Sequence, residues 1–270
     1  MAKILLDKYY TSPDLAKYIV DKTKLIIGEE NITEYIEPSA GAGVFLDYLN
    51  KPYLAYDIEP EDNKGRIVKC DFLELDLEYK KGRCVIGNPP YGEKNTLSVK
   101  FFNKAIEFAD YISFILPISQ YKNNQQMYKF DLIHSENLGI HTYSNRQIYC
   151  CFNIYKIPLN GLNNKIKYKL NDMEIIESRF GNRIPNNYDL RLLAWGTGIN
   201  GLKLGGILNK THKQYSKEFY IKINNNNIKN KIINIFRETD WCKEYPMTAT
   251  PNLLQWQVYK YIKEQIPEIN

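Results

Sequence analysis

The 270-residue sequence contains no run of about 18 apolar residues, the length that a membrane-spanning helix requires. Its first residues, MAKILLDKYY, also lack the long apolar core of a secretory signal. These two absences argue against a transmembrane protein and against an exported one. We therefore expect an intracellular, cytoplasmic protein that has no membrane partner.

Cysteine is sparse and poorly placed for either of its structural uses. The five cysteines include no pair separated by two residues, and no histidine lies close to them in the sequence. This spacing argues against a zinc site and against a disulfide framework. We expect these cysteines to be small buried side chains, and we expect no bound metal.

The chain is long enough for one large domain and a smaller one, and its charge is divided unevenly along it. Residues 1–158 carry 19 Lys and Arg against 21 Asp and Glu, whereas residues 159–270 carry 17 against 10. The net charges are therefore −2 and +7. We predict a core domain over 1–158 and a smaller basic domain over 159–270, whose charge suits a polyanionic partner.

Strand and helix patterns alternate through the first domain. Ser12, Pro13 and Asp14 form the start of a helix that should run to about Gly28, and a further helix is expected to begin at Val44. Apolar runs bounded by turn residues predict strands at 32–36, 53–58, 67–70, 84–87 and 112–116, with a helix at about 98–110 before the last. This rhythm predicts an α/β fold: a Rossmann-like, mostly parallel sheet that ends in an antiparallel hairpin of residues 139–143 and 148–155.

Small and polar residues stand where these strands end. They are the loop Pro38–Gly43, Asp57, the pair Asp71 and Phe72, and the tetrapeptide Asn88-Pro89-Pro90-Tyr91. Ligands of parallel α/β sheets bind at the carboxyl ends of the strands. We therefore expect these motifs to line one site.

The tetrapeptide is the strongest of these motifs. The amino group of adenine is a poor nucleophile because its lone pair is delocalised into the ring. The Asn88 side-chain oxygen and the Pro89 carbonyl can accept both N–H bonds of such a group and aim its lone pair at a methyl donor, without a strong base. Pro89 and Pro90 stiffen the loop, and Tyr91 offers a ring on which a planar group can stack.

In order and in position, these motifs resemble the gamma class of adenine-N6 DNA methyltransferases. The resemblance covers about residues 9–156, and the tail matches only in position and charge. It implies transfer of a methyl group from S-adenosylmethionine to N6 of adenine in DNA, on a base flipped out of the duplex. The residues that carry it are Tyr10-Thr11-Ser12-Pro13, Glu37-Pro38-Ser39-Ala40-Gly41-Ala42-Gly43 and Asn88-Pro89-Pro90-Tyr91.

The resemblance also implies how the cofactor would be held. Glu37, Ala40 and Gly41 would line its methionine part, and Thr11 would close over it. The glycine has an independent reason to be there, because a backbone without Cβ lets a ligand approach closely.

The adenosine part of the cofactor would meet acids at the next strand ends. Either Asp57 or Glu59 could accept the ribose hydroxyls, and we favour Asp57 because it stands at the strand end. Asp71 would accept from the adenine amino group, and Phe72 would stack on the adenine ring.

Two tyrosines are expected to stack on the target base. Tyr91 is the first, and the second should come from the strand at 148–155. Alternation along this strand puts Tyr149, Cys151, Asn153 and Tyr155 on one face and Cys150, Phe152 and Ile154 on the other. Because the set with Phe152 suits the core better, we expect Tyr155 to be the second stacking residue.

Other functions share this chemistry. Enzymes that methylate the glutamine amide of translation release factors have the same tetrapeptide but carry a helical domain before the core, and with Thr11 so near the start we expect none here. N6-adenine methylation of RNA stays open, although the basic tail favours DNA. A silent nucleic-acid-binding subunit is disfavoured because the tetrapeptide and the glycine loop are intact. The sequence leaves three biological roles open: protection in a restriction-modification system with a partner endonuclease, regulatory marking of the genome, and a role in a phage.

The basic domain contains a conspicuous glycine-rich segment, Trp195–Gly201, which Arg179, Arg183 and Arg191 precede. The segment could lie along the DNA backbone or in a groove, or it could be a turn cluster anchored by a buried Trp. A C-terminal helix is expected over residues 252–262.

We predict that a chain truncated at Pro158 keeps its fold and loses DNA binding, because the basic domain supplies most of the phosphate contacts. Binding by the full chain should fall steeply with salt. Anisotropy titrations of both chains against a labelled duplex test this. Equal affinity of the two chains would contradict the predicted division.

Overall fold

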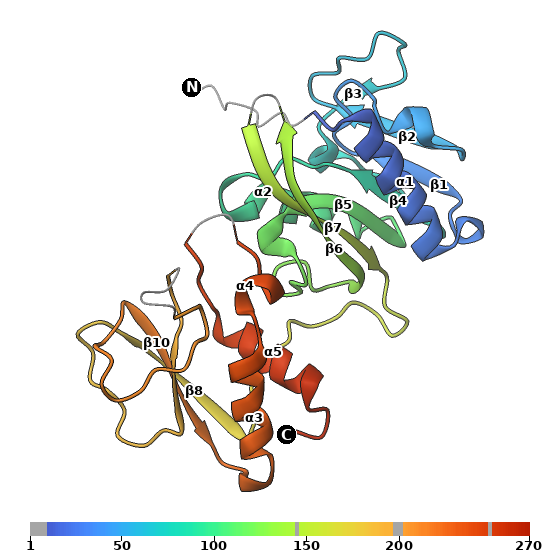
Figure 1. Cartoon of the computed structure of the whole chain (residues 1–270). Coiled ribbons are helices and arrows are strands. Elements are labelled where there is room, and N and C mark those ends of the chain that lie inside the picture. Colours follow the sequence, from blue (N-terminus) through green and yellow to red (C-terminus); the bar gives the residue numbers. More distant parts are fainter. Residues whose placement is uncertain (1–9, 144–145, 197–201, 248–249) are drawn as a thin grey trace. The chain divides into compact units, whose positions relative to one another are not determined.

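The computed structural model describes residues 10–143, 146–196, 202–247 and 250–270 (Figure 1). The chain divides into two compact units between Lys165 and Ile166, a few residues beyond Pro158. Among the described residues, no helix is long and apolar enough to cross a membrane. Most of the glycine-rich segment, Thr197–Gly201, lies outside the described residues.

The first unit is built on a seven-stranded sheet in the order β3-β2-β1-β4-β5-β7-β6. Neighbouring strands from β3 to β5 run parallel, and β7 is antiparallel to both β5 and β6. This confirms the predicted α/β fold with a mostly parallel, Rossmann-like sheet and a terminal antiparallel hairpin. The strands are β1 (Glu34–Glu37), β2 (Tyr53–Asp57), β3 (Val68–Lys69), β4 (Arg83–Gly87), β5 (Tyr111–Pro117), β6 (Asp131–Tyr143) and β7 (Arg146–Lys156).

Two helices accompany this sheet. Helix α1 (Pro13–Ile27) begins as predicted, with Ser12 Oγ accepting a hydrogen bond from the Leu15 amide at 3.3 Å. Helix α2 (Thr96–Ala105) is shorter than expected. The helix expected at Val44 was wrong, because the chain forms only a 3₁₀ turn before it reaches Pro52, a residue that disfavours helix at the position before it. The 3₁₀ turns are η1 (Glu29–Asn31), η2 (Leu46–Tyr48), η3 (Phe72–Glu74), η4 (Glu93–Asn95) and η5 (Ile118–Gln120).

Apolar side chains cover both faces of this sheet. One buried cluster contains Phe102, Phe114 and Tyr155, and the other contains Ile115 and Phe152. Every residue of β7 from Cys150 to Tyr155 is buried. Burial on both sides is usual for parallel α/β sheets. The choice of Tyr155 as a stacking residue assumed that one face of its strand is open, and the structure leaves neither face open.

The second unit has a three-stranded antiparallel sheet in the order β8-β10-β9. Its helices cover one face, since strand residues Leu192, Phe219 and Ile221 share a buried cluster with Ile232 and Val258. The elements are β8 (Met173–Arg179), β9 (Leu190–Leu193), β10 (Lys217–Ile223), α3 (Asn226–Glu238), α4 (Trp241–Glu244) and α5 (Gln255–Gln265).

Two local features of this unit concern an asparagine run and a tryptophan. The asparagine run at 224–227 forms the start of a helix, because Asn225 caps α3 by accepting from the Asn227 amide at 3.1 Å. Trp195, a possible buried anchor in the sequence, is 42% exposed.

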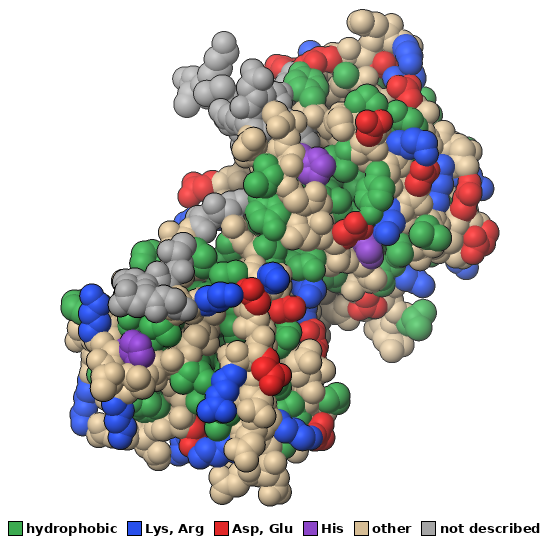
Figure 2. Space-filling view, viewed as in Figure 1, with side chains coloured by type: hydrophobic (Ala, Val, Ile, Leu, Met, Phe, Trp, Pro, Cys, Tyr) green, Lys and Arg blue, Asp and Glu red, His purple; other side chains and the backbone are tan. Residues whose placement is uncertain are grey.

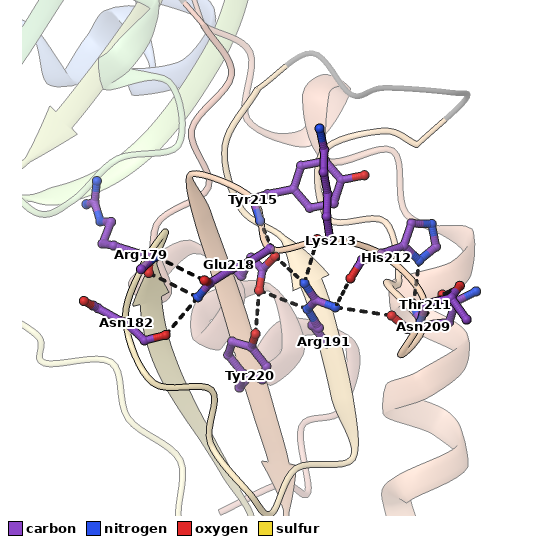
Figure 3. A network of polar contacts seen from close by, with 12 residues as sticks. Arg179, Asn182, Arg191, Asn209, Thr211, His212, Lys213, Tyr215, Glu218 and Tyr220 are labelled. Atoms are coloured by element: carbon purple, nitrogen blue, oxygen red, sulfur yellow. Dashed lines mark hydrogen bonds and ion pairs between the residues drawn. The ribbon is translucent and has the colours of Figure 1, made fainter.

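A buried ion pair lies on the face of the small sheet that the helices leave open (Figure 3). Arg191 donates to both carboxylate oxygens of Glu218, at 2.9 and 2.7 Å. Tyr220 and the Tyr215 amide also donate to this carboxylate, at 2.6 and 2.7 Å. Burial alone would raise the pKa of Glu218, but the hydrogen bonds from Arg191 and Tyr220 outweigh it and hold this pKa below its ordinary value.

We predict that Arg191→Ala lowers the free energy of unfolding by about 3–5 kcal/mol, because it leaves the Glu218 carboxylate buried and unpaired. A carboxyl whose pKa is lowered by folding contributes stability above its unfolded pKa, about 4.3, and loses it as pH falls through the folded value. Denaturant titrations should therefore show the largest effect near neutral pH. Arg179→Ala is the matched control, because that side chain is 64% exposed and its loss should change stability by about 0.5 kcal/mol or less. Equal effects of the two substitutions would contradict the account.

Candidate functional site

A cavity of about 450 Å³ opens in the first unit at the carboxyl ends of the parallel strands. The loops after β1, β2, β3 and β4 form its walls, together with the segment that leads into α1. Nine of the residues singled out in the sequence line it: Thr11, Glu37, Ala40, Gly41, Asp57, Asp71, Phe72, Asn88 and Pro90. The structure thus brings together motifs that are separated by up to about eighty positions.

The loop after β1 is shaped by its glycines. Gly41 has a φ of 54°, in the left-handed region that favours glycine, and a Cβ added there would meet no atom within 4 Å. Gly41 therefore leaves its backbone open to the cavity at a point where a ligand can come close. The loop is held by a hydrogen bond from the Ala40 amide to the Tyr56 carbonyl at 2.9 Å.

Asp57 stands at the end of β2 with both carboxylate oxygens oriented by backbone amides. Gly41 N donates to Oδ2 at 2.8 Å, and Glu59 N donates to Oδ1 at 2.7 Å. Each carboxylate oxygen can accept a further bond, so Asp57 is suited to bind a pair of hydroxyl groups. Asp57 lines the cavity, whereas Glu59, the alternative left open by the sequence, is not among its lining residues.

The wall after β3 combines an acid with an aromatic ring. Asp71 caps η3 by accepting from the Leu73 amide at 2.9 Å, which fixes its carboxylate at the cavity. Phe72 is 1% exposed and stacks on Phe101, with their ring centroids 5.2 Å apart. A planar group that enters here would meet a rigid apolar wall beside a hydrogen-bond acceptor.

Glu37 is the most unusual group of the site. It is 2% exposed, and its Oε2 atom has no hydrogen-bond partner among the described residues. Burial, and next the charge of Asp57, raise the pKa of Glu37 well above its ordinary value. A buried acceptor without a partner is costly, so this position calls for a donor or a cation that the described residues do not supply.

Asn88 follows β4 and is held at both ends of its amide. Its Nδ2 donates to Thr11 Oγ1 at 3.3 Å, and its Oδ1 accepts from the Tyr91 hydroxyl at 2.9 Å. These contacts join the segment before α1 to the tetrapeptide. They fix which face of the Asn88 amide is turned toward the cavity.

Three of the expected site residues do not line the cavity. Pro89 lies beside it in the tetrapeptide, and Tyr91 is 5% exposed, with its hydroxyl near Cys150 Sγ at 3.6 Å as well as Asn88. The expectation for Tyr155 is corrected: it is fully buried, it packs edge-on against Phe102, and it has no open ring face for a base.

Sequence reasoning missed several residues of the cavity wall. Cys70 lines the cavity and immediately precedes Asp71, so the motif Asp71-Phe72 could have indicated it. Leu97 and Phe101 reach the cavity from α2, and their spacing of four residues marks one face of a helix. Tyr10, which belongs to a motif named in the sequence, also lines the cavity, and its hydroxyl donates to both carboxylate oxygens of Glu61 at 2.7 Å.

Comparison of sequences finds no relative, since no protein-family model and no curated protein matches the chain. Comparison of structures finds methyltransferases. A Pyrococcus horikoshii protein assigned as an RNA methyltransferase, PH1948, is 18% identical, with a TM-score of 0.46 over 58% of this chain and 91% of its own. The 23S rRNA methyltransferase ErmE is 13% identical, with a TM-score of 0.43 over 58% of this chain and 72% of its own.

A third similar structure is the methyltransferase subunit of a type I restriction-modification system from Streptococcus thermophilus. It is 14% identical, with a TM-score of 0.42 over 56% of this chain, and the chain spans about half (46%) of that subunit. These identities and scores describe a resemblance in sheet architecture. The case for a particular chemistry therefore depends on the residues of the cavity itself.

We predict that Glu37→Gln stabilises the ligand-free protein at neutral pH. A carboxyl whose pKa is raised by folding costs stability as pH rises above its unfolded pKa of about 4.3, because the folded state holds the proton longer. Glutamine has the same shape and no charge. The melting temperature of the variant should match that of the wild type near pH 4 and exceed it by roughly 2–4 °C at neutral pH.

Glu34→Gln is the matched control for this experiment. Burial alone would raise the pKa of Glu34, but hydrogen bonds from Lys80 and Arg83 outweigh it and lower this pKa. Its replacement should therefore reduce the melting temperature at neutral pH. If Glu37→Gln also reduced it, the Glu37 carboxylate would have a partner in the folded protein.

Proposed function

We propose that this protein is an S-adenosylmethionine-dependent methyltransferase that methylates N6 of adenine in DNA. The observation that carries the proposal is the position of Asn88. Its amide is oriented by Thr11 and Tyr91 at the edge of a cavity whose other walls offer acceptors and an aromatic stack in the order that an adenosyl cofactor needs.

The cavity suits S-adenosylmethionine group by group. The unpartnered Oε2 of Glu37 would be satisfied by the cofactor's ammonium group, and the open backbone at Gly41 gives the methionine chain room. Asp57 would accept the two ribose hydroxyls. At the far wall, Asp71 would accept from the adenine amino group beside the stacked ring of Phe72. When bound, the cofactor supplies a methyl group bonded to a positively charged sulfur. The carbon of this methyl group is the electrophile of the reaction.

The chain's own contribution to the reaction is orientation. The Asn88 Oδ1 and the Pro89 carbonyl would each accept one N–H bond of the target amine, which leaves the nitrogen lone pair directed away from both acceptors. An amide oxygen has two lone pairs, so Oδ1 can serve the amine and the Tyr91 hydroxyl together. Tyr91 and Thr11 act through Asn88, because they prevent its amide from rotating away.

DNA is the proposed substrate because of the charge of the second unit and the depth of the site. The basic region after residue 158 carries a net charge of +7, which suits phosphate contacts. A stiff loop at a strand end cannot reach N6 inside a base stack, so the target adenine would be flipped out of the duplex. Protection against a restriction endonuclease is one role that such an activity would serve.

We predict that Asn88→Ala and Asp57→Ala separate the two halves of this function. Asn88→Ala should abolish methyl transfer and leave cofactor affinity nearly unchanged, because Asn88 is proposed to hold the target amine. Asp57→Ala should weaken cofactor binding roughly 10- to 150-fold, as expected for the loss of hydrogen bonds to a charged group. Calorimetry with S-adenosylmethionine and transfer of labelled methyl groups to DNA measure the two effects.

Asn63→Ala is the matched control, since Asn63 is exposed and its side chain makes no hydrogen bond among the described residues. It should change neither measurement. An Asn88→Ala protein that still turned over within about tenfold of wild type, about 1.4 kcal/mol of barrier, would remove Asn88 from the role proposed for it.

A further inference from the structure

Two loops of the second unit are tied together by one side chain. Gln214 accepts from the Gly181 amide at 3.1 Å and donates to the carbonyls of Arg179 and Asn182 at 3.2 and 3.1 Å (Figure 3). It thereby links residues 179–188, which begin at the last residue of β8, to residues 209–216, before β10. We call these two segments the paired loops.

The second of the paired loops, residues 209–216, is also held by Arg191. Arg191, fixed by Glu218, donates to the carbonyls of Asn209, His212 and Lys213 at 3.3, 3.0 and 2.9 Å. Arg191 is only 4% exposed, so it shapes this loop rather than contacting a partner. Loops whose backbone is already fixed lose little conformational entropy when they bind.

The paired loops expose one aromatic ring and several cations. Phe180 is 73% exposed, and the Arg179 side chain is 64% exposed. The loops contain no Asp or Glu, and Figure 2 shows Lys and Arg side chains (blue) at several places on the surface of the second unit. Arg179 pairs with Glu177 at 2.8 Å. The other cations of the loops have no carboxylate within ion-pair distance among the described residues: Arg183, Lys210 and Lys213.

We propose that the paired loops bind nucleic acid, with Phe180 stacking on an unpaired base and with Arg183 and Lys213 contacting phosphates. An exposed ring beside cations that have no carboxylate partner fits a ligand that is both planar and anionic. The choice of partner rests on the proposed function. The surface itself follows from the contacts within the second unit and would bind without any adenine in the catalytic cavity.

The test is the affinity of the full-length protein for fluorescent single-stranded oligothymidine of about 16 nucleotides. This probe contains no adenine, so its binding does not depend on the methylation target. Phe180→Leu keeps an apolar side chain but removes the ring, and it should weaken binding roughly 5- to 150-fold, the range for loss of one base–aromatic stack. Phe180→Trp should bind about as tightly as the wild type, because tryptophan also offers a ring on which a base can stack.

The phosphate contacts have their own measurement. Arg183→Ala and Lys213→Ala should each reduce the slope of log affinity against log salt by about 0.7, the value for one phosphate contact with a single strand. Arg237→Ala is the matched control: it removes an exposed cation from the last turn of α3, which packs on the other face of the small sheet. It should leave the slope unchanged.

The outcomes separate this inference from the proposed function. Oligothymidine affinity of Phe180→Leu within about twofold of wild type would overturn the paired-loop surface, even if methyl transfer to DNA were normal. Binding of anionic phospholipid vesicles that required Phe180, with none to oligothymidine, would overturn it as well. Intact binding to the paired loops in a protein that transfers no methyl group would count against the proposed function alone.

Discussion

The parallel pairing of β3, β2, β1 and β4 is the constraint on which the site depends. Parallel strands end at one edge of the sheet, and the loops that follow these four strands line the same cavity. That geometry places Glu37, Asp57 and Asn88 around one cavity although they are distant in sequence. The burial of the sheet on both faces keeps these strand ends rigid, and rigidity matters for chemistry that works by orientation.

Much of this could be predicted from the sequence, because strand ends followed by glycine, acid or Asn-Pro-Pro-Tyr are local patterns. What could not be predicted depends on contacts across the chain. Tyr155 looked available for stacking because alternation assumes one open face, and β7 has none. The ion pair of Arg191 could not be predicted because nothing near it in sequence indicates Glu218, which is provided by a neighbouring strand. The hydrogen bond from the Tyr91 hydroxyl to Asn88 could not be predicted either, because it depends on how the tetrapeptide folds.

The two units treat their buried charges in opposite ways. In the second unit Arg191 fully satisfies Glu218, and the pair fixes a loop surface. In the first unit Glu37 is buried with one oxygen unsatisfied, which destabilises the empty cavity and favours a cationic ligand. A protein that binds a charged small molecule in one unit and a polyanion in the other would need both arrangements.

The central claim is tested most directly by incubating the protein with methyl-labelled S-adenosylmethionine and equal amounts of DNA, RNA and protein, and then digesting each to its monomers. The account predicts label in DNA, on N6-methyladenine, and none there with Asn88→Ala. Label only on adenine in RNA would support N6-adenine methylation and contradict DNA as the substrate. Label on glutamine in protein, or no label in any of the three, would contradict the claim.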